Sequence, residues 1–186
     1  MKFKGVRKIH QGKFITRYDL EYETEDGNEK IYEMISRSPE IKSFDDLCSS
    51  RADAVVMIIH DENGEKLLLN REYRMATGQW IINFPAGLID PGETADIAAQ
   101  RELHEETGLR LLHIDEVWKE SYSAIGFSNE KTIVVIGTAS GEIGQSDSDV
   151  EDIEARWYTK EEIRKLLITD NFAARTQAYC VLWSRE

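Results

Sequence analysis

Apolar and polar residues alternate along the first 37 positions of the chain, most clearly in VRKIHQGKFITRYDLEYE and EKIYEMIS. A period of two is typical of strands that bury one face and expose the other. Gly12 and the turn-forming cluster Glu25–Asn28 interrupt this alternation. The pattern predicts two or three antiparallel strands, followed by a polar connection over residues 38–52.

The pattern changes at Ala54, where the apolar run AVVMII indicates a strand that is buried on both faces. The turn signal DENG and the run KLLLN complete a hairpin with it. Further strands are predicted over residues 80–84, 109–120, 132–136 and 154–158, and helices over 94–107, 160–167 and 173–183. This order favours a mixed α/β (α+β) fold with helices flanking a sheet. We place the domain boundary near residue 40, giving an N-terminal antiparallel β extension (1–40) and a main domain (41–186).

The segment Thr94–Thr107 predicts a helix whose acidic residues share its apolar face. It contains no proline or glycine, and Gly108 follows where a helix C-cap belongs. At roughly 100° per residue, Glu102, Glu105 and Glu106 fall on the side of the small apolar residues. Those residues are Ala95, Ala98, Ala99 and Leu103. Glu102 and Glu106 point most squarely at this side.

Acidic residues on a helix normally lie opposite its apolar face, where water solvates them. Carboxylates gathered at a buried edge repel one another and are costly to desolvate, so a cation that neutralises them is expected. Oxygen ligands suit Mg²⁺ or Mn²⁺ better than zinc. The four histidines and two cysteines form no HxxxH or CxxC pair that would favour another metal.

Composition narrows the class of protein. With 41% hydrophobic residues among 186, the chain is able to build a core. Its longest apolar run is too short for a bilayer, and MKFKGVRKIH lacks the apolar centre of a signal peptide, so we expect a cytoplasmic protein. A net charge of −12 disfavours nucleic acids and anionic membranes as partners. A small phosphorylated ligand stays compatible, because a metal and a few arginines override the global charge locally.

The segment GLIDPGETADIAAQRELHEETGL, residues 87–109, resembles the complete signature of the Nudix hydrolase family. The matching positions are Gly87, Glu93, Arg101, Glu102, Leu103, Glu105, Glu106, Gly108 and Leu109. The order of elements over residues 50–186 is also similar to that family. The resemblance implies a Nudix-type α/β/α sandwich with a mixed sheet, here preceded by a small N-terminal antiparallel sheet.

The resemblance also implies an activity, namely Mg²⁺- or Mn²⁺-dependent hydrolysis of a nucleoside diphosphate linked to another group. The products would be a nucleoside monophosphate and a phosphorylated second product. It assigns metal binding to Glu93, Glu102 and Glu106, and catalysis to Glu105 and Glu106. Arg101, Gly87 and Gly108 take structural parts, with Arg101 pairing with a glutamate of the signature.

The stretch REYRMATGQWIINFPAGLIDPGE looks like the ADP-ribose pyrophosphatase branch of that family. This likeness implies that the Ala86 carbonyl ligates a metal and that Arg71, Tyr73 and Arg74 bind substrate. Arginine suits a diphosphate because the planar guanidinium pairs with phosphate oxygens. The alternative is a strand end with surface arginines. The branch also implies a homodimer built through residues 1–37.

Two further positions bear on catalysis and substrate. The acidic stretch SDVEDIE resembles a loop that brings a glutamate over the metals, with Glu151 as the best match and Asp149 as its partner. Ile125 stands where ADP-ribose-specific members usually have proline, so GDP-mannose or another nucleotide sugar is an alternative substrate. Two non-enzymatic alternatives are a nucleotide-sensing module and a structural dimerisation protein. The convergence of the acids disfavours the structural protein.

Overall fold

The computed structural model of the chain describes residues 1–48, 51–146 and 152–185. It divides into two compact units. Unit 1 comprises Met1–Asp53 together with Glu120–Thr132, and unit 2 comprises Ala54–Lys119 together with Ile133–Glu186. Unit 1 thus runs beyond residue 40, and a domain boundary at that residue stays a prediction.

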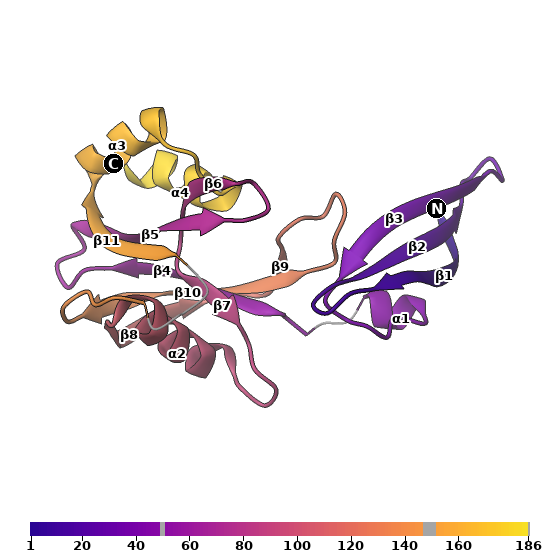
Figure 1. Cartoon of the computed structure of the whole chain (residues 1–186), viewed down its shortest axis with the longest axis horizontal. Coiled ribbons are helices and arrows are strands. Elements are labelled where there is room, and N and C mark those ends of the chain that lie inside the picture. Colours follow the sequence, from indigo (N-terminus) through magenta and orange to yellow (C-terminus); the bar gives the residue numbers. More distant parts are fainter. Residues whose placement is uncertain (49–50, 147–151, 186) are drawn as a thin grey trace. The chain divides into compact units, whose positions relative to one another are not determined.

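Unit 1 contains the expected N-terminal sheet. Its antiparallel strands, in the order β1-β2-β3, are β1 (Lys2–Gln11), β2 (Thr16–Glu23) and β3 (Glu29–Ser36) (Figure 1). Alternating residues bury one face, on which Tyr18, Leu20 and Met34 pack with Ile41. A short helix, α1 (Phe44–Leu47), interrupts the expected polar connection and is capped by the Ser43 side chain.

The segment around Ile125 belongs to unit 1. After β9 (Ser121–Tyr122), the chain turns and follows β3, where the Ile35 amide donates to the Phe127 carbonyl at 2.8 Å. The Tyr32 hydroxyl donates to the Gly126 carbonyl in the same turn. The Ile125 side chain itself remains 76% exposed.

The larger sheet contains eight strands within the described residues, with the central order β11-β5-β4-β10-β8. Strand β6 pairs with β5, β7 with β4, and β9 with β10. The strands beyond β9 are β4 (Ala54–His60), β5 (Lys66–Arg74), β6 (Gln79–Asn83), β7 (Ala86–Leu88), β8 (Arg110–Val117), β10 (Lys131–Ser140) and β11 (Ile153–Thr159). The short strands β7 and β9 were not predicted, because two or three residues are too few to show a period.

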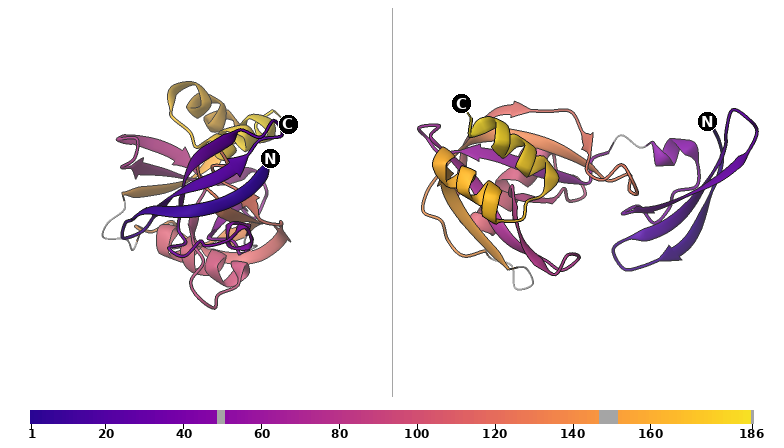
Figure 2. Two further views of the ribbon diagram at one scale, coloured as in Figure 1. Left: turned by 90° about the vertical axis from the view of Figure 1, so that its right-hand side faces the viewer. Right: turned by 90° about the horizontal axis from the view of Figure 1, so that it is seen from above.

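Helices cover both faces of the sheet in unit 2. Helix α2 (Ala95–Thr107) lies on one face, and α3 (Lys160–Thr169) and α4 (Ala174–Trp183) lie side by side on the other (Figures 1 and 2). This layering confirms the expected α/β/α sandwich. In the part of the chain that the structure describes, no helix is both long and apolar enough to span a lipid bilayer.

Strand alternation decides which helix each side chain meets. In β5, Leu68 packs in the cluster that includes α2, whereas Leu67 and Leu69 pack with α3 and α4. Successive strand residues point to opposite faces, so Asn70, the next on the Leu68 side, faces α2. This assignment places polar residues of β5 against the acidic helix.

Candidate active site

Helix α2 presents its acids at three depths. It begins after Thr94 and ends at Gly108, whose left-handed conformation (φ 72°) lets its amide donate to the His104 carbonyl at 2.8 Å. Glu106 is buried, with 8% exposure. The side chain of Glu102 is 15% exposed and that of Glu105 is 48% exposed. Glu102 and Glu106 are therefore the acids that the fold withdraws from water, while Glu105 stays at the rim.

Glu106 is a buried carboxyl held by two donors. Its Oε2 accepts from Asn70 Nδ2 at 2.8 Å, and the Ala86 amide also donates to it. Burial raises the pKa of Glu106 well above its ordinary value, and the charges of Glu102 and Glu72 raise that pKa further. The two donors act in the opposite direction, because they stabilise the ionised form. The site is thus one in which added positive charge would be strongly favourable.

Arg101 joins the acids to the loop that precedes the helix. Its Nε and Nη2 bind the two oxygens of Glu93 at 2.9 and 2.8 Å. Its Nη1 binds Glu102 at 2.8 Å and Glu105 at 3.1 Å, and Nη2 also donates to the Leu88 carbonyl. Arg101 is the main cause that lowers the pKa of Glu93 to about 2. This contact set matches the structural part that the resemblance implies for Arg101.

Glu93 also accepts a hydrogen bond from the Asp90 amide at 3.0 Å. Both of its oxygens are therefore engaged within the loop. This favours loop-holding over metal binding for Glu93.

Gly87 lies against Glu102 so closely that no side chain fits. A Cβ at this position would stand 1.9 Å from the Glu102 carboxyl carbon. Gly87 is held there by the pairing of β7 with β4, where it lies opposite Val55. Ala86, whose carbonyl is a candidate metal ligand, is the preceding residue of the same strand.

The structure adds polar residues from β5 and β6 that the sequence analysis did not single out. Asn70 is 1% exposed and Glu72 is 9% exposed. Glu72 Oε1 accepts from Asn83 Nδ2 at 2.9 Å, and Asn83 Oδ1 accepts from the Thr176 hydroxyl of α4 at 2.8 Å. The sequence did hold a signal for them, because Asn70 and Glu72 follow Leu68 at every second position of β5 and therefore point to the same buried face.

The two candidate arginines lie on different faces of β5. The Arg71 guanidinium lies 4.4 Å from the ring centroid of Trp80 and binds Glu154 at 3.1 Å. Tyr73 packs on the same ring at 5.8 Å. Arg74 follows Glu72 by two residues and therefore points to the same face as Glu72, toward Glu106. Its Nη1 lies 3.6 Å from Glu72 Oε2. The structure therefore brings Arg74, and not Arg71, onto the face of the acids. Glu151 and Asp149 lie outside the described residues.

The chemistry of this site fits a hard divalent cation. The donors that the resemblance implies are oxygens, namely the Glu102 and Glu106 carboxylates and the Ala86 carbonyl. Asn70 Oδ1 adds a buried oxygen that has no hydrogen-bond partner among the described residues. Within those residues no three acidic, histidine or cysteine side chains are grouped as a ready metal site. Glu102 is engaged by Arg101 and Glu106 by Asn70.

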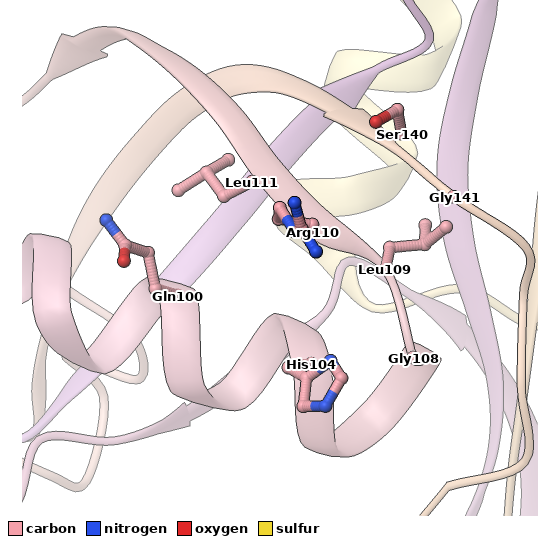
Figure 3. Close-up of a pocket in the computed structure, with 8 residues that line it drawn as sticks. All are labelled: Gln100, His104, Gly108, Leu109, Arg110, Leu111, Ser140 and Gly141. Atoms are coloured by element: carbon pink, nitrogen blue, oxygen red, sulfur yellow. The ribbon is translucent and has the colours of Figure 1, made fainter.

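A separate cavity of about 420 Å³ lies on the outer side of α2 (Figure 3). It is bordered by Gln100 and His104 of the helix and by Arg110 at the start of β8. None of the carboxylates described above lines it. The cavity therefore does not belong to the acidic site.

Comparison with known proteins defines the family. The chain matches the family profile described as NUDIX domain over residues 50–179. It therefore belongs to the Nudix family, as the signature over residues 87–109 predicts. A crystal structure titled as ADP compounds hydrolase has the same fold, with a TM-score of 0.75 and 22% identity over 100% of this chain and 93% of that one.

Three curated relatives are 28% to 34% identical to the chain. The chain is 30% identical to NAD-capped RNA hydrolase NUDT12 of Homo sapiens, covering 77% of this chain but only 30% of that protein. It is 28% identical to ADP compounds hydrolase NudE of Escherichia coli, covering 82% and 75%. It is 34% identical to ADP-ribose pyrophosphatase of Mycobacterium tuberculosis, covering 56% and 51%. Because the chain spans about a third of the human protein, that protein's whole activity does not transfer to it.

Proposed function

We propose that the chain hydrolyses the diphosphate bond of a nucleoside diphosphate derivative, namely ADP-ribose or a related nucleotide sugar. The products would be a nucleoside monophosphate and a phosphorylated second product. The observation that carries this proposal is the withdrawal of Glu102 and Glu106 from water beside Ala86 and Gly87, in a chain of the Nudix family. Two bacterial relatives are named ADP compounds hydrolase and ADP-ribose pyrophosphatase, and these names support the same substrate class.

A divalent cation, Mg²⁺ or Mn²⁺, held by Glu102, Glu106 and the Ala86 carbonyl would neutralise phosphate charge and acidify the attacking water. The chain's own residues prepare the site for that step. Arg101 orients the Glu102 carboxylate, and Asn70 orients Glu106. Arg74, on the same face, makes a long ion pair of 3.6 Å with Glu72 and would pair with diphosphate oxygens through its fork of donors. Glu105 and Glu151 are the candidates for the group that accepts the water proton.

One departure from the ADP-ribose branch leaves a second candidate for the substrate. Ile125 replaces the proline expected there, and its side chain is 76% exposed in the turn that follows β3. GDP-mannose therefore stays the second candidate substrate. A nucleotide-sensing module without turnover is less favoured, because every acid of the signature is present.

The first test is hydrolysis of ADP-ribose and of GDP-mannose side by side with Mg²⁺, with AMP and GMP separated by chromatography. Glu106→Gln and Glu102→Gln should each lower turnover by about 10²-fold or more while the circular dichroism spectrum stays native. Glu105→Gln separates the two candidates for the proton acceptor: a comparable loss of turnover would assign that part to Glu105, and an unchanged rate would leave it to Glu151. Tight nucleotide binding without turnover, unchanged by Glu106→Gln, would instead favour the sensing module.

We also propose that the protein acts as a homodimer joined through the sheet of unit 1. This sheet and the connection between β1 and β2 leave apolar side chains in water, namely Ile31 at 52% and Phe14 at 70% exposure. Light scattering after size-exclusion chromatography should give about twice the 21.4 kDa chain mass. Ile31→Lys should shift the mass to that of a single chain, and a monomeric wild-type protein would end the proposal.

A further inference from the structure

Asn70 is the most deeply buried polar partner of the acidic site. It is 1% exposed and lies 36 residues before Glu106, whose Oε2 accepts from its Nδ2 at 2.8 Å. When Glu106 is ionised, as a cation ligand is, the amide must present this nitrogen, because the opposite orientation would set Oδ1 against a carboxylate oxygen. Nδ2 and Oδ1 belong to one rigid carboxamide, so the hydrogen bond of Nδ2 to Glu106 also fixes the position of Oδ1.

The surrounding protein supplies Asn70 Oδ1 with no donor. Among the described residues this oxygen is buried and has no hydrogen-bond partner. Its strand neighbours in register are Asn83 and Ala155. The Asn83 amide nitrogen binds Glu72, and Ala155 has no polar side chain. The Ala86 amide, a donor at this site, is directed to Glu106.

A buried acceptor without a donor costs stability, and native proteins seldom keep one without a purpose. An apolar residue of similar size would fill the same space without that cost. The same amide is bound to Glu106, whose pKa the charges of Glu102 and Glu72 raise. An additional neutral oxygen in such a place suits a hard cation and its water shell, since these bind oxygen atoms.

We propose that Asn70 is a positioning residue of the cation site, acting through both ends of its amide. Nδ2 fixes the orientation of Glu106, and Oδ1 supplies a neutral oxygen to the cation, directly or through one water. This inference rests on the proposed metal-dependent function. It extends the site from the signature helix α2 to strand β5.

The test measures cation binding rather than turnover. Purified wild-type protein and variants are titrated with Mn²⁺, and free Mn²⁺ is followed by its electron paramagnetic resonance signal. Asn70→Leu keeps the volume and removes both polar ends, and it should weaken Mn²⁺ binding by about 10- to 100-fold, as loss of a residue that orients a ligand does. Thr107→Val is the matched control, because it removes a fully buried polar group whose partners are the Leu103 carbonyl and the Leu109 amide rather than an acid of the site. Its Mn²⁺ affinity should stay near that of the wild type.

The outcomes separate the inference from the proposed function. Equal Mn²⁺ affinity of wild type and Asn70→Leu would overturn the part assigned to Asn70 and leave the function standing. A wild-type protein that binds no Mn²⁺ would overturn both. If Asn70→Leu does not fold, Asn70→Asp decides, because it keeps an oxygen and adds a charge beside Glu106. Its melting temperature without metal should fall, and Mn²⁺ should raise that temperature more than in the wild type; a smaller rise overturns the inference.

Discussion

Gly87→Ala is a change of one methyl group that should disable the site while leaving the fold. The new Cβ would lie 1.9 Å from Cδ of Glu102 and 2.1 and 2.2 Å from its oxygens. Ordinary van der Waals contact begins at 3.4 Å. The carboxyl group must therefore move by about 1.5 Å, which breaks or lengthens its 2.8 Å bond to Arg101.

The size of the effect follows from that displacement. A misplacement of about 1 Å in a catalytic constellation costs on the order of 10²-fold in rate, so we expect kcat/KM for ADP-ribose with Mg²⁺ to fall at least that far. The side chain of Glu102 is flexible and lies at the edge of the core, so it is able to give way. The melting temperature should therefore drop by only a few degrees, as circular dichroism would show.

Two controls make this prediction sharp. Gly64→Ala meets nothing within 4 Å but carries a φ of +71°, so it should cost about 1 kcal/mol of stability and leave kcat/KM unchanged. In a Glu102→Ala background, Gly87→Ala should have little further effect, because the displaced group is already absent. Wild-type kcat/KM in Gly87→Ala, or losses that simply add in the double variant, would refute the reasoning.

Three further predictions follow from individual contacts. Arg74→Ala should lower kcat/KM by about 10-fold or more, which is what loss of a charge-assisted phosphate contact costs. Arg71→Ala should lower kcat/KM less, because Arg71 lies on the other face of β5. Equal losses in steady-state kinetics would contradict the assignment of the two arginines to different faces. Arg101→Lys keeps the charge but loses the fork that binds Glu93 and Glu102 together, so kcat should fall, and an unchanged kcat would argue against preorganisation. Burial lowers the pKa of His60 below its ordinary value of 6.5, so the unfolded chain takes up a proton first as pH falls. The free energy of unfolding, measured with urea, should therefore decrease below that pH, and the decrease should be smaller in His60→Gln.

The local pattern predicts most of the secondary structure and the part of the site that one helix carries. A period of two identifies β1 to β3, apolar runs around a turn identify β4 and β5, and the wheel of residues 94–107 places Glu102 and Glu106 on the buried side of α2. These features depend on residues a few positions apart, whose relative directions are fixed once the backbone is helical or extended. The spacing of the signature also identifies the family, because all of its positions lie on one loop and the helix that follows it.

Packing decides what the pattern leaves open. On an ideal wheel Arg101 lies next to Glu105, four residues on, but away from Glu102. It also reaches Glu93 and Glu102 because its long side chain folds back over the loop that precedes the helix. Strand register settles that Arg74 rather than Arg71 shares the face of the acids.

The sequence by itself determined the longer elements, the acidic face of α2 and the family of this protein. Only the tertiary structure joined Asn70 to Glu106 across 36 residues, set Glu72 near them and pressed Gly87 against Glu102. The physical reason is that periodicity records the direction of a side chain relative to its own element. The pairing of strands and the packing of helices decide which other element this side chain contacts, and both depend on the whole core at once.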